Sequence, residues 1–421
     1  MIEPREFPAA WPRRGPLVAG IVFVALAAVV SPPFVERVTG ALHWTDAAVR
    51  WTLSIALALV AVVLGCWAWT SKGITPAVLM RRSPRAAAFG VGIVSTLLCL
   101  GLVEGGFFLA GRDAEGPPAV ERGTSTEGFY ESDVLLGYRP VAGSRVTAIK
   151  LIGDRVVYDV VYTIDDEGRR VTPASSARAG DSLVLFFGGS VTFGEGVQDD
   201  ETLPNAFAAA APGTRVLNYG FRGYGPQQML AMLEDGRLDH EIENRDVTAV
   251  YTFIDAHVAR AVGSMIIVTS WGVDMPHYVS GPDGRLLLDG SFRTGRPIVN
   301  WLYALASKSH VVSYLGADLP PRRAKHFDLT ARIVRQSADR IAARAASTRM
   351  FVVLHPSVRA GEPIAAALAG SPVQVLDFTG LWDASDPAYV IPDDWHPTPL
   401  GHRLLAQELV PALARSPRDS P

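Results

Sequence analysis

The second half of the chain alternates short apolar runs with segments of helical periodicity. The apolar runs are LVLFF, RVLNY, TAVYTFI, MFVVL and VQVLDF, and the helical pattern occupies residues 202–211, 227–233, 328–346 and 399–413. Strands that alternate with helices form a parallel sheet, because each crossover between parallel strands carries a helix that covers one face. We therefore expect residues 182–421 to form a three-layer α/β/α domain built on a parallel sheet.

A long insertion interrupts this alternation between residues 262 and 325. Loops of this length inside a compact domain commonly border a functional site. We expect the insertion to form a lid or wall of a substrate site, or alternatively to contribute a packed helix around residues 301–315.

Two further patterns precede the α/β region. Residues 112–126 are rich in Gly, Pro and charged side chains, which is typical of a linker. Residues 144–164 alternate apolar and polar side chains around Gly153-Asp154, which indicates a β-hairpin. Residues 112–181 are therefore predicted to be a linker followed by a small β appendage.

Three apolar stretches occupy the first 111 residues. Residues 15–35 and 51–71 carry no charge, and residues 86–111 contain a single charged side chain, Glu104. Each is about as long as the 20 residues that cross a bilayer as a helix. The first stretch could instead be a secretory signal peptide, but no small-x-small cleavage site follows it. Residues 1–111 are predicted to form three transmembrane helices, with the lipid bilayer as a partner.

The distribution of basic residues predicts the orientation of these spans. Seven lie before the first span or between the second and third, and two lie between the first and second: Arg5, Arg13, Arg14, Lys72, Arg81, Arg82 and Arg85, against Arg37 and Arg50. Basic loops stay in the cytoplasm. The chain is therefore predicted to be a multi-pass protein of the plasma (inner) membrane, with everything after Gly111 outside the cytoplasm.

Charge and cysteine usage exclude several classes of function. The formal net charge is -3, with 39 basic and 42 acidic residues, so the chain lacks the basic excess typical of nucleic-acid binding. Its two cysteines, Cys66 and Cys99, both lie in predicted spans. The part after Gly111 therefore has no disulfide, no thiol nucleophile and no thiolate metal site.

A candidate nucleophile follows the first apolar run, in the sequence LVLFFGGSVTFGEGV. Ser190 comes directly after Gly188 and Gly189, and small residues allow a strand to turn sharply and expose a hydroxyl group. Taken alone, such a turn could also be purely structural, or could cradle a phosphate group.

A candidate base lies near the C-terminus, in IPDDWHPTPLGH. His396 can accept the hydroxyl proton of Ser190, and Asp393, three residues earlier, can fix the tautomer of His396 and stabilise the imidazolium. Alternatively, imidazole and carboxylate groups in this segment could bind a metal ion, through Asp393, Asp394, His396 and His402. We prefer the triad, because a metal site leaves Ser190 unexplained.

These segments resemble the SGNH (GDSL-like) hydrolase superfamily over about residues 182–413. GGSVTFGEGV is similar to the family's Gly-Asp-Ser-x-(Ser/Thr)-x-Gly, with Gly189 in place of the aspartate. NYGFRGYGPQQM resembles Asn-x-Gly-x-x-Gly, whose last glycine, here Gly223, donates its N–H to the oxyanion. DDWHP matches Asp-x-x-His-Pro, and Gly401-His402 opens the trailing helix as in many members.

The family's third block does not match. Members usually end the third strand with Gly-x-Asn-Asp, whose asparagine side chain donates to the oxyanion, whereas this chain has YTFIDAHVAR. Asp255 is nearest to that asparagine by strand register, but an ionised carboxylate would repel an oxyanion. His257 can donate a hydrogen bond, so both positions stay open at this point.

The resemblance implies a flavodoxin-like SGNH fold and a serine esterase that needs no cofactor and no metal. The implied substrates are acyl or acetyl esters, and export to the cell envelope suggests that they are carried on envelope glycans or lipids. Two alternatives remain. The same triad could serve an O-acetyltransferase that acts on envelope polysaccharide, or the domain could bind glycans without catalysis.

The predicted topology can be tested with reporter fusions. A reporter joined after Gly111 should be active only when it is an enzyme that functions outside the cytoplasm, because three crossings place that point outside. A matched fusion in the loop of residues 72–85 should give the opposite response. A cytoplasmic signal after Gly111 would contradict the orientation.

Overall fold

The computed structural model describes residues 104, 119–122, 128–176 and 182–414. Within these residues, no helix combines the length and the apolar character that a membrane crossing requires. The three predicted spans lie outside the described residues, apart from Glu104. The described residues fall into two compact units, one with Glu104 and Ala304–Ala317, and a larger one with the remainder.

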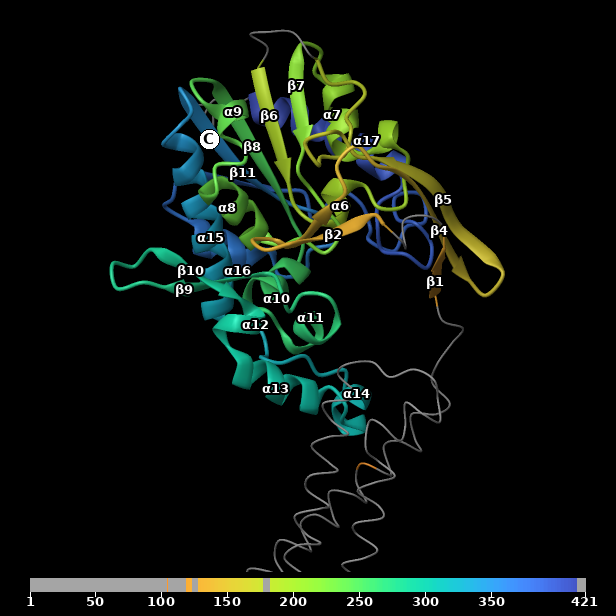
Figure 1. Ribbon diagram of the computed structural model, residues 1–421. Coiled ribbons are helices and arrows are strands. Elements are labelled where there is room, and N and C mark those ends of the chain that lie inside the picture. The colour runs from red at the N-terminus through yellow and green to blue at the C-terminus, as the bar shows by residue number, and fades with distance from the viewer. Residues whose placement is uncertain (1–103, 105–118, 123–127, 177–181, 415–421) are drawn as a thin grey trace, which may run out of the picture. The chain divides into compact units, whose positions relative to one another are not determined.

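A five-stranded parallel sheet forms the centre of the larger unit (Figure 1). Its order is β12-β11-β8-β6-β7, and every neighbouring pair is parallel. The strands are β6 (Ser182–Phe187), β7 (Thr214–Asn218), β8 (Asp246–Phe253), β11 (Ser347–Leu354) and β12 (Val373–Asp377). All five apolar runs therefore form the predicted strands.

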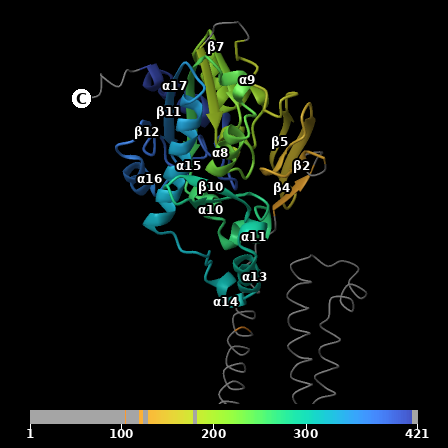
Figure 2. The same cartoon turned by 60° about the vertical axis from the view of Figure 1, so that its left-hand side comes forward.

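Helices cover both faces of this sheet. One face carries α8 (Pro226–Glu234), α15 (Ala324–Ala342) and α16 (Gly361–Leu368), and the other carries α7 (Leu203–Ala210) and α17 (Pro399–Ala414). Helices α8 and α15 pack against each other on their face (Figures 1 and 2). The predicted α/β architecture with a parallel sheet is confirmed.

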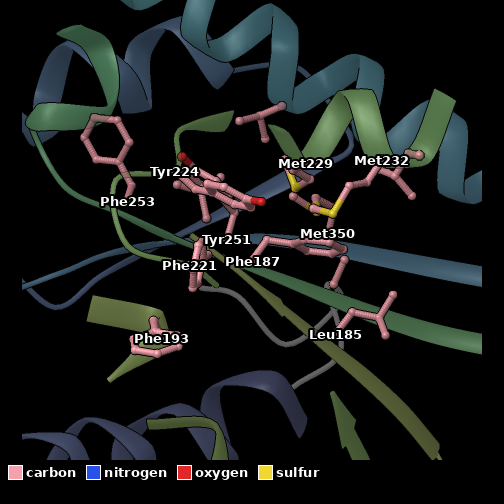
Figure 3. Packing of buried hydrophobic residues seen from close by; sticks show 14 of the residues in the cluster. Leu185, Phe187, Phe193, Phe221, Tyr224, Met229, Met232, Tyr251, Phe253 and Met350 are labelled. Carbon is pink, nitrogen blue, oxygen red and sulfur yellow. The ribbon is translucent and has the colours of Figure 1, made fainter. Parts of the chain in front are cut away.

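The side-chain alternation of β6 shows why both faces must be covered. Leu185 and Phe187 pack into one apolar cluster, and Val184 and Phe186 into the other. Figure 3 shows the first cluster, where Met229 of α8 lies over the sheet. A strand with apolar side chains on both faces loses hydrophobic stabilisation unless helices exclude water from each of them.

The predicted hairpin is formed by β4 (Arg145–Ile152) and β5 (Arg155–Thr163), which pair antiparallel on either side of Gly153-Asp154. Strand β1 (Ala119–Arg122) extends it, and β2 (Tyr130–Asp133) pairs with β3 (Gly137–Pro140). The hairpin projects from one side of the sheet in both views (Figures 1 and 2). Its Tyr162 is nevertheless buried in the main core, against Phe129 and Phe193. The β4–β5 hairpin and the central sheet therefore share one core.

The buried guanidinium of Arg170, which follows the β4–β5 hairpin in the sequence, contacts the segment of residues 193–199. Arg170 is only 2% exposed, and it donates hydrogen bonds to the carbonyl oxygens of Phe193 (3.0 Å), Gly194 (2.5 Å) and Val197 (2.7 Å). It also pairs with the carboxylate of Asp199 at 3.1 Å. A buried cation is tolerated when its donors are satisfied in this way, so Arg170 fixes the course of residues 193–199.

The insertion forms short elements that continue from α10 (Ala256–Val262). They are α11 (Met265–Ser270), β9 (Pro276–Ser280), β10 (Leu286–Ser291), α12 (Phe292–Gly295) and α13 (Pro297–Ala306), followed in the smaller unit by α14 (His310–Tyr314). Residues 301–315 are thus largely helical, but Ala304 is the only buried residue of α13. The predicted packed helix is therefore mostly at the surface.

In the smaller unit, Glu104 is hydrogen-bonded to the start of α14. Its carboxylate accepts from the Ser309 hydroxyl (2.5 Å) and from the backbone N–H of His310 (2.7 Å). An anion at this end of a helix compensates for N–H groups that have no partner within the helix. The contact is a cap, which is a structural role.

Candidate active site

The nucleophile turn is formed by two glycines that no other residue could replace without movement. Gly188 has a φ of +150°, and a Cβ atom there would overlap the side chain of Thr192. A Cβ atom on Gly189 would lie 2.5 Å from Nη1 of Arg260. Ser190 then begins the short helix α6 (Ser190–Phe193) at the carboxyl end of β6. Parallel sheets bind their ligands at this end of their strands.

Ser190 and His396 are brought together by the fold, although 206 positions separate them. The Nε2 atom of His396 lies 2.7 Å from the Ser190 hydroxyl oxygen, and its Nδ1 atom lies 2.5 Å from Oδ1 of Asp394. All three residues are at most 5% exposed. A carboxylate, an imidazole and a hydroxyl in one series of hydrogen bonds is the arrangement that activates a serine nucleophile.

The carboxylate in this series is Asp394, so the prediction of Asp393 is wrong on geometry. Asp393 is exposed and forms an ion pair with Arg155. We predicted Asp393 because, in a helix, side chains three residues apart lie on the same face, as Asp393 and His396 would. Residues 391–396 instead form a tight turn, closed by the N–H of Ile391 on the carbonyl of His396 (2.9 Å). Asp393 adopts a positive φ of 61° in this turn.

Lys150 of the β4–β5 hairpin completes the surroundings of Asp394. Its ammonium group lies 2.7 Å from Oδ2 of Asp394, while the backbone N–H of His396 donates to Oδ1 at 2.9 Å. Burial alone would raise the pKa of Asp394, but the hydrogen bonds from His396 and Lys150 outweigh it and hold that pKa well below the ordinary value. Asp394 is therefore ionised and can orient the imidazole. Sequence patterns gave no signal for Lys150, which is 244 positions away.

A second carboxylate lies on the other side of the imidazole. Oε2 of Glu195 is 3.5 Å from Nε2 of His396, and Oε1 accepts a hydrogen bond from Arg222 at 2.7 Å. Burial opposes ionisation of Glu195, but the charges of His396 and Arg222 prevail and lower its pKa. Sequence patterns did not indicate this pair, although Glu195 lies in the GGSVTFGEGV segment and Arg222 is next to Gly223.

Backbone N–H groups are available for an oxyanion at the nucleophile. The N–H of Ser190 belongs to the first turn of α6, where no intrahelical acceptor exists. Gly223 has a φ of +76°, and a Cβ atom there would lie 2.7 Å from Nε1 of Trp271 in the insertion. The carbonyl of Tyr224 lies 3.1 Å from the Cβ position of Gly189. The Gly223 turn thus adjoins the nucleophile turn, and the insertion borders it.

The two candidates in the third block face different ways. The carboxylate of Asp255 accepts the backbone N–H groups of Arg359 (3.0 Å) and Ala360 (3.2 Å), and so caps the loop before α16. The Nε2 atom of His257, in contrast, lies 3.0 Å from the Cβ position of Gly189. Of the two, His257 is the residue beside the nucleophile turn.

Hydrogen bonds define the tautomer of His257. Its Nδ1 atom is 2.8 Å from the Tyr251 hydroxyl and 3.4 Å from the N–H of Ile254. Because the N–H can only donate, Nδ1 is the acceptor and the ring proton is assigned to Nε2. Burial and the nearby charge of Arg260 hold the pKa of His257 well below its usual value. The ring is therefore neutral, and its Nε2–H is a buried donor without a partner among the described residues.

The remaining histidines near the triad do not form a metal site. Burial lowers the pKa of both His355 and His402 to about 3, so both rings are neutral. Within the part of the chain that the structure describes, no group of three or more His, Cys, Asp or Glu side chains is arranged to hold a metal ion. The alternative set that included His402 therefore has no support in the geometry.

An exposed tryptophan covers the imidazole. Trp395 is 47% exposed, and its ring centroid lies 4.0 Å from that of His396. It also lines a surface hollow of about 530 Å³, together with Lys150, Pro392 and Asp394. The mainly aliphatic and aromatic lining of this hollow is suited to the apolar part of a small ligand.

Solved structures match this chain, whereas family models and curated proteins do not. No protein-family model matches the chain, and no curated protein matches its sequence. Among solved structures, it is similar to a lipolytic G-D-S-L family protein from Veillonella parvula, at 15% identity and a TM-score of 0.32, over 56% of this chain and all of that one. It is also similar to the acetyl xylan esterase Est2A from Butyrivibrio proteoclasticus, at 10% identity and a TM-score of 0.32, over 56% of this chain and 64% of that one.

The assignment of Asp394 is testable with a matched pair of variants. Asp394→Asn should slow covalent labelling of Ser190 by a fluorophosphonate by about 10⁴-fold, because an amide in this position favours the wrong imidazole tautomer. Asp393→Asn removes one exposed carboxylate of the same turn and should change the labelling rate less than about threefold. Equal losses in the two variants would contradict the assignment.

Proposed function

We propose that this chain is a serine esterase of the SGNH (GDSL-like) type that hydrolyses acyl or acetyl esters. The observation that carries the proposal is the continuous hydrogen-bonded series from Asp394 through His396 to Ser190. The series lies at the carboxyl end of β6, next to the backbone N–H of Ser190 and to Nε2–H of His257, which has no partner among the described residues. Such donors are the second part that acyl transfer requires.

Each step of the proposed reaction uses a group in the described site. His396 takes the proton of Ser190 as its oxygen attacks the ester carbonyl, and returns that proton to the departing alcohol. Water then attacks the acyl-Ser190 intermediate and gives one proton to His396, which passes it to the Ser190 oxygen as the bond to the acyl group breaks and the acid leaves. Asp394 orients the imidazole and stabilises its charged form throughout.

The negative charge that develops on the carbonyl oxygen needs donors fixed in advance. We assign this role to the N–H groups of Ser190 and Gly223 and to Nε2–H of His257. Ser190 and His257 are buried and Gly223 is half-buried, which supports the assignment because hydrogen bonds to a developing charge are stronger where water is excluded. His257 would thus take the part that an asparagine side chain plays in the resembling family.

The substrate class is proposed from location. If the three apolar stretches span the plasma membrane in the predicted orientation, the catalytic domain faces the cell envelope, and esters on envelope glycans or lipids are the available substrates. An O-acetyltransferase is the second candidate, since an acceptor hydroxyl can replace water in the second half of the reaction. A glycan-binding role without catalysis is disfavoured by the complete hydrogen-bonded series.

The function is tested with the full-length protein in detergent. A fluorophosphonate should label the wild type, and Ser190→Ala and His396→Ala should each lose nearly all labelling and turnover of acetylated sugars, because members of one catalytic unit act together. Assays with and without an acceptor glycan separate free acetate from transferred acetyl. Retention of full esterase activity by Ser190→Ala would refute the nucleophile.

The role of His257 is tested by two substitutions. His257→Ala should lower kcat by about 10²-fold to 10³-fold with little change in KM, because it removes one oxyanion donor. His257→Asn restores a side-chain donor and should recover part of that loss. Comparable kcat values for the wild type and His257→Ala would leave the oxyanion to the backbone donors alone.

A further inference from the structure

Glu195 is a buried carboxylate that the triad mechanism does not use. It follows α6 by two residues and is 7% exposed. The guanidinium of Arg222 donates a hydrogen bond of 2.7 Å to Oε1 of Glu195 and compensates the negative charge. The second oxygen, Oε2, lies 3.5 Å from Nε2 of His396, the nitrogen that holds the Ser190 hydroxyl. An ion pair with Arg222 would stabilise Glu195 equally well if the carboxylate lay far from His396. The ion pair therefore does not explain why Oε2 of Glu195 lies so close to the imidazole.

The spacing between these two atoms fits one small molecule. An oxygen atom at about 2.8 Å from each, a normal hydrogen-bond length, forms a triangle whose third side is the observed 3.5 Å. In the resting site Ser190 is the partner of Nε2. Once the serine oxygen is part of an ester, it can no longer donate to His396, and Nε2 becomes available to a second nucleophile.

We propose that Glu195 selects water as this second nucleophile and positions it for attack on the acyl-Ser190 intermediate. The inference rests on the proposed esterase function. Water gives one hydrogen bond to Nε2 of His396 and the other to Oε2 of Glu195. As its oxygen bonds to the acyl carbon, its first proton moves to His396 and then to Ser190, whose bond to the acyl group breaks. The second proton stays on the product acid.

An alcohol cannot make the same pair of contacts. It has one hydroxyl hydrogen, which goes to His396, and a carbon substituent lies where water has its second hydrogen. That substituent would leave the charge of Glu195 without a hydrogen bond on this side, which is costly for a buried anion. Glu195 is therefore a specificity-determining residue that favours hydrolysis over transfer to a hydroxyl acceptor.

The experiment measures how the acyl-enzyme partitions. The full-length protein is given 4-nitrophenyl acetate and a fixed concentration of methanol, and the ratio of methyl acetate to acetate is measured. In Glu195→Gln the amide oxygen accepts from Arg222, which turns the NH₂ group toward the water position, where it cannot accept a hydrogen bond. We expect this ratio to rise about tenfold or more, as for loss of one hydrogen bond to a charged group.

A matched control and a second variant separate this role from a structural one. Glu241 is also a buried carboxylate, 4% exposed, and pairs with Arg169 (2.8 Å) and Arg215 (2.7 Å) away from the triad. Glu241→Gln should leave the partition ratio unchanged. Glu195→Asp keeps a charge for Arg222 but withdraws the carboxylate from His396, so the ratio of methyl acetate to acetate should rise in this variant too. It provides the test if the glutamine variant does not fold.

The outcomes distinguish this inference from the proposed function. Release of 4-nitrophenol with an unchanged ratio in both Glu195 variants would overturn the role of Glu195 and leave the esterase intact. A wild type that forms mainly methyl acetate would also overturn it. Absence of any Ser190-dependent 4-nitrophenol release would overturn the esterase and this inference together.

Discussion

The buried guanidinium of Arg170 is the interaction on which the geometry of the site depends. It donates to one backbone carbonyl at the end of α6 and to two in the loop that follows. Tyr162 of β5 lies against it, with the guanidinium carbon 4.5 Å from the ring centroid. The loop contains two positive-φ glycines, Gly194 and Gly196, and has little regular structure of its own. Arg170 therefore supplies the order that holds Glu195 near the base, and it makes the β strands part of the catalytic architecture.

Charges of alternating sign surround the imidazole from both ends. Lys150 neutralises Asp394 on the Nδ1 side, and Arg222 neutralises Glu195 on the Nε2 side. Each carboxylate is buried, and each pKa is lowered because the cation and the imidazole outweigh the cost of burial. An imidazolium formed in the proposed acyl transfer thus lies between two ionised carboxylates, whose own charges are compensated. The direct contacts with both carboxylates favour proton transfer to His396, and the negative oxyanion of the proposed reaction offsets the positive charge that this transfer adds.

The sequence was sufficient to predict the sheet, because the strands and helices follow hydrophobic periodicity and apolar runs that local composition reveals. It was also sufficient to place Ser190 and His396 in one site, since both follow predicted strands of a parallel sheet. It failed at Asp393, where the fold uses a turn and not a helical spacing. Lys150 and Glu195 were missed for another reason. Their importance comes from tertiary contacts, and each would pass for an ordinary charged residue in the sequence.

Gly189 and the third block, the two places where the sequence differs from the SGNH pattern that it resembles, lie next to each other in the structure. Arg260 is 5% exposed, donates to the Tyr224 carbonyl at 2.8 Å, and has no carboxylate within ion-pair distance among the described residues. Its Nη1 atom and the His257 ring lie where a side chain at position 189 would begin. A Cβ atom there would lie 2.5 Å from Nη1 of Arg260 and 3.0 Å from Nε2 of His257, so a glycine at position 189 leaves room for both groups. The same turn then has a neutral imidazole donor and a buried positive charge beside it, and both would favour the negative charge of the proposed oxyanion. The two differences from the resembling family are therefore compatible with the proposed oxyanion site.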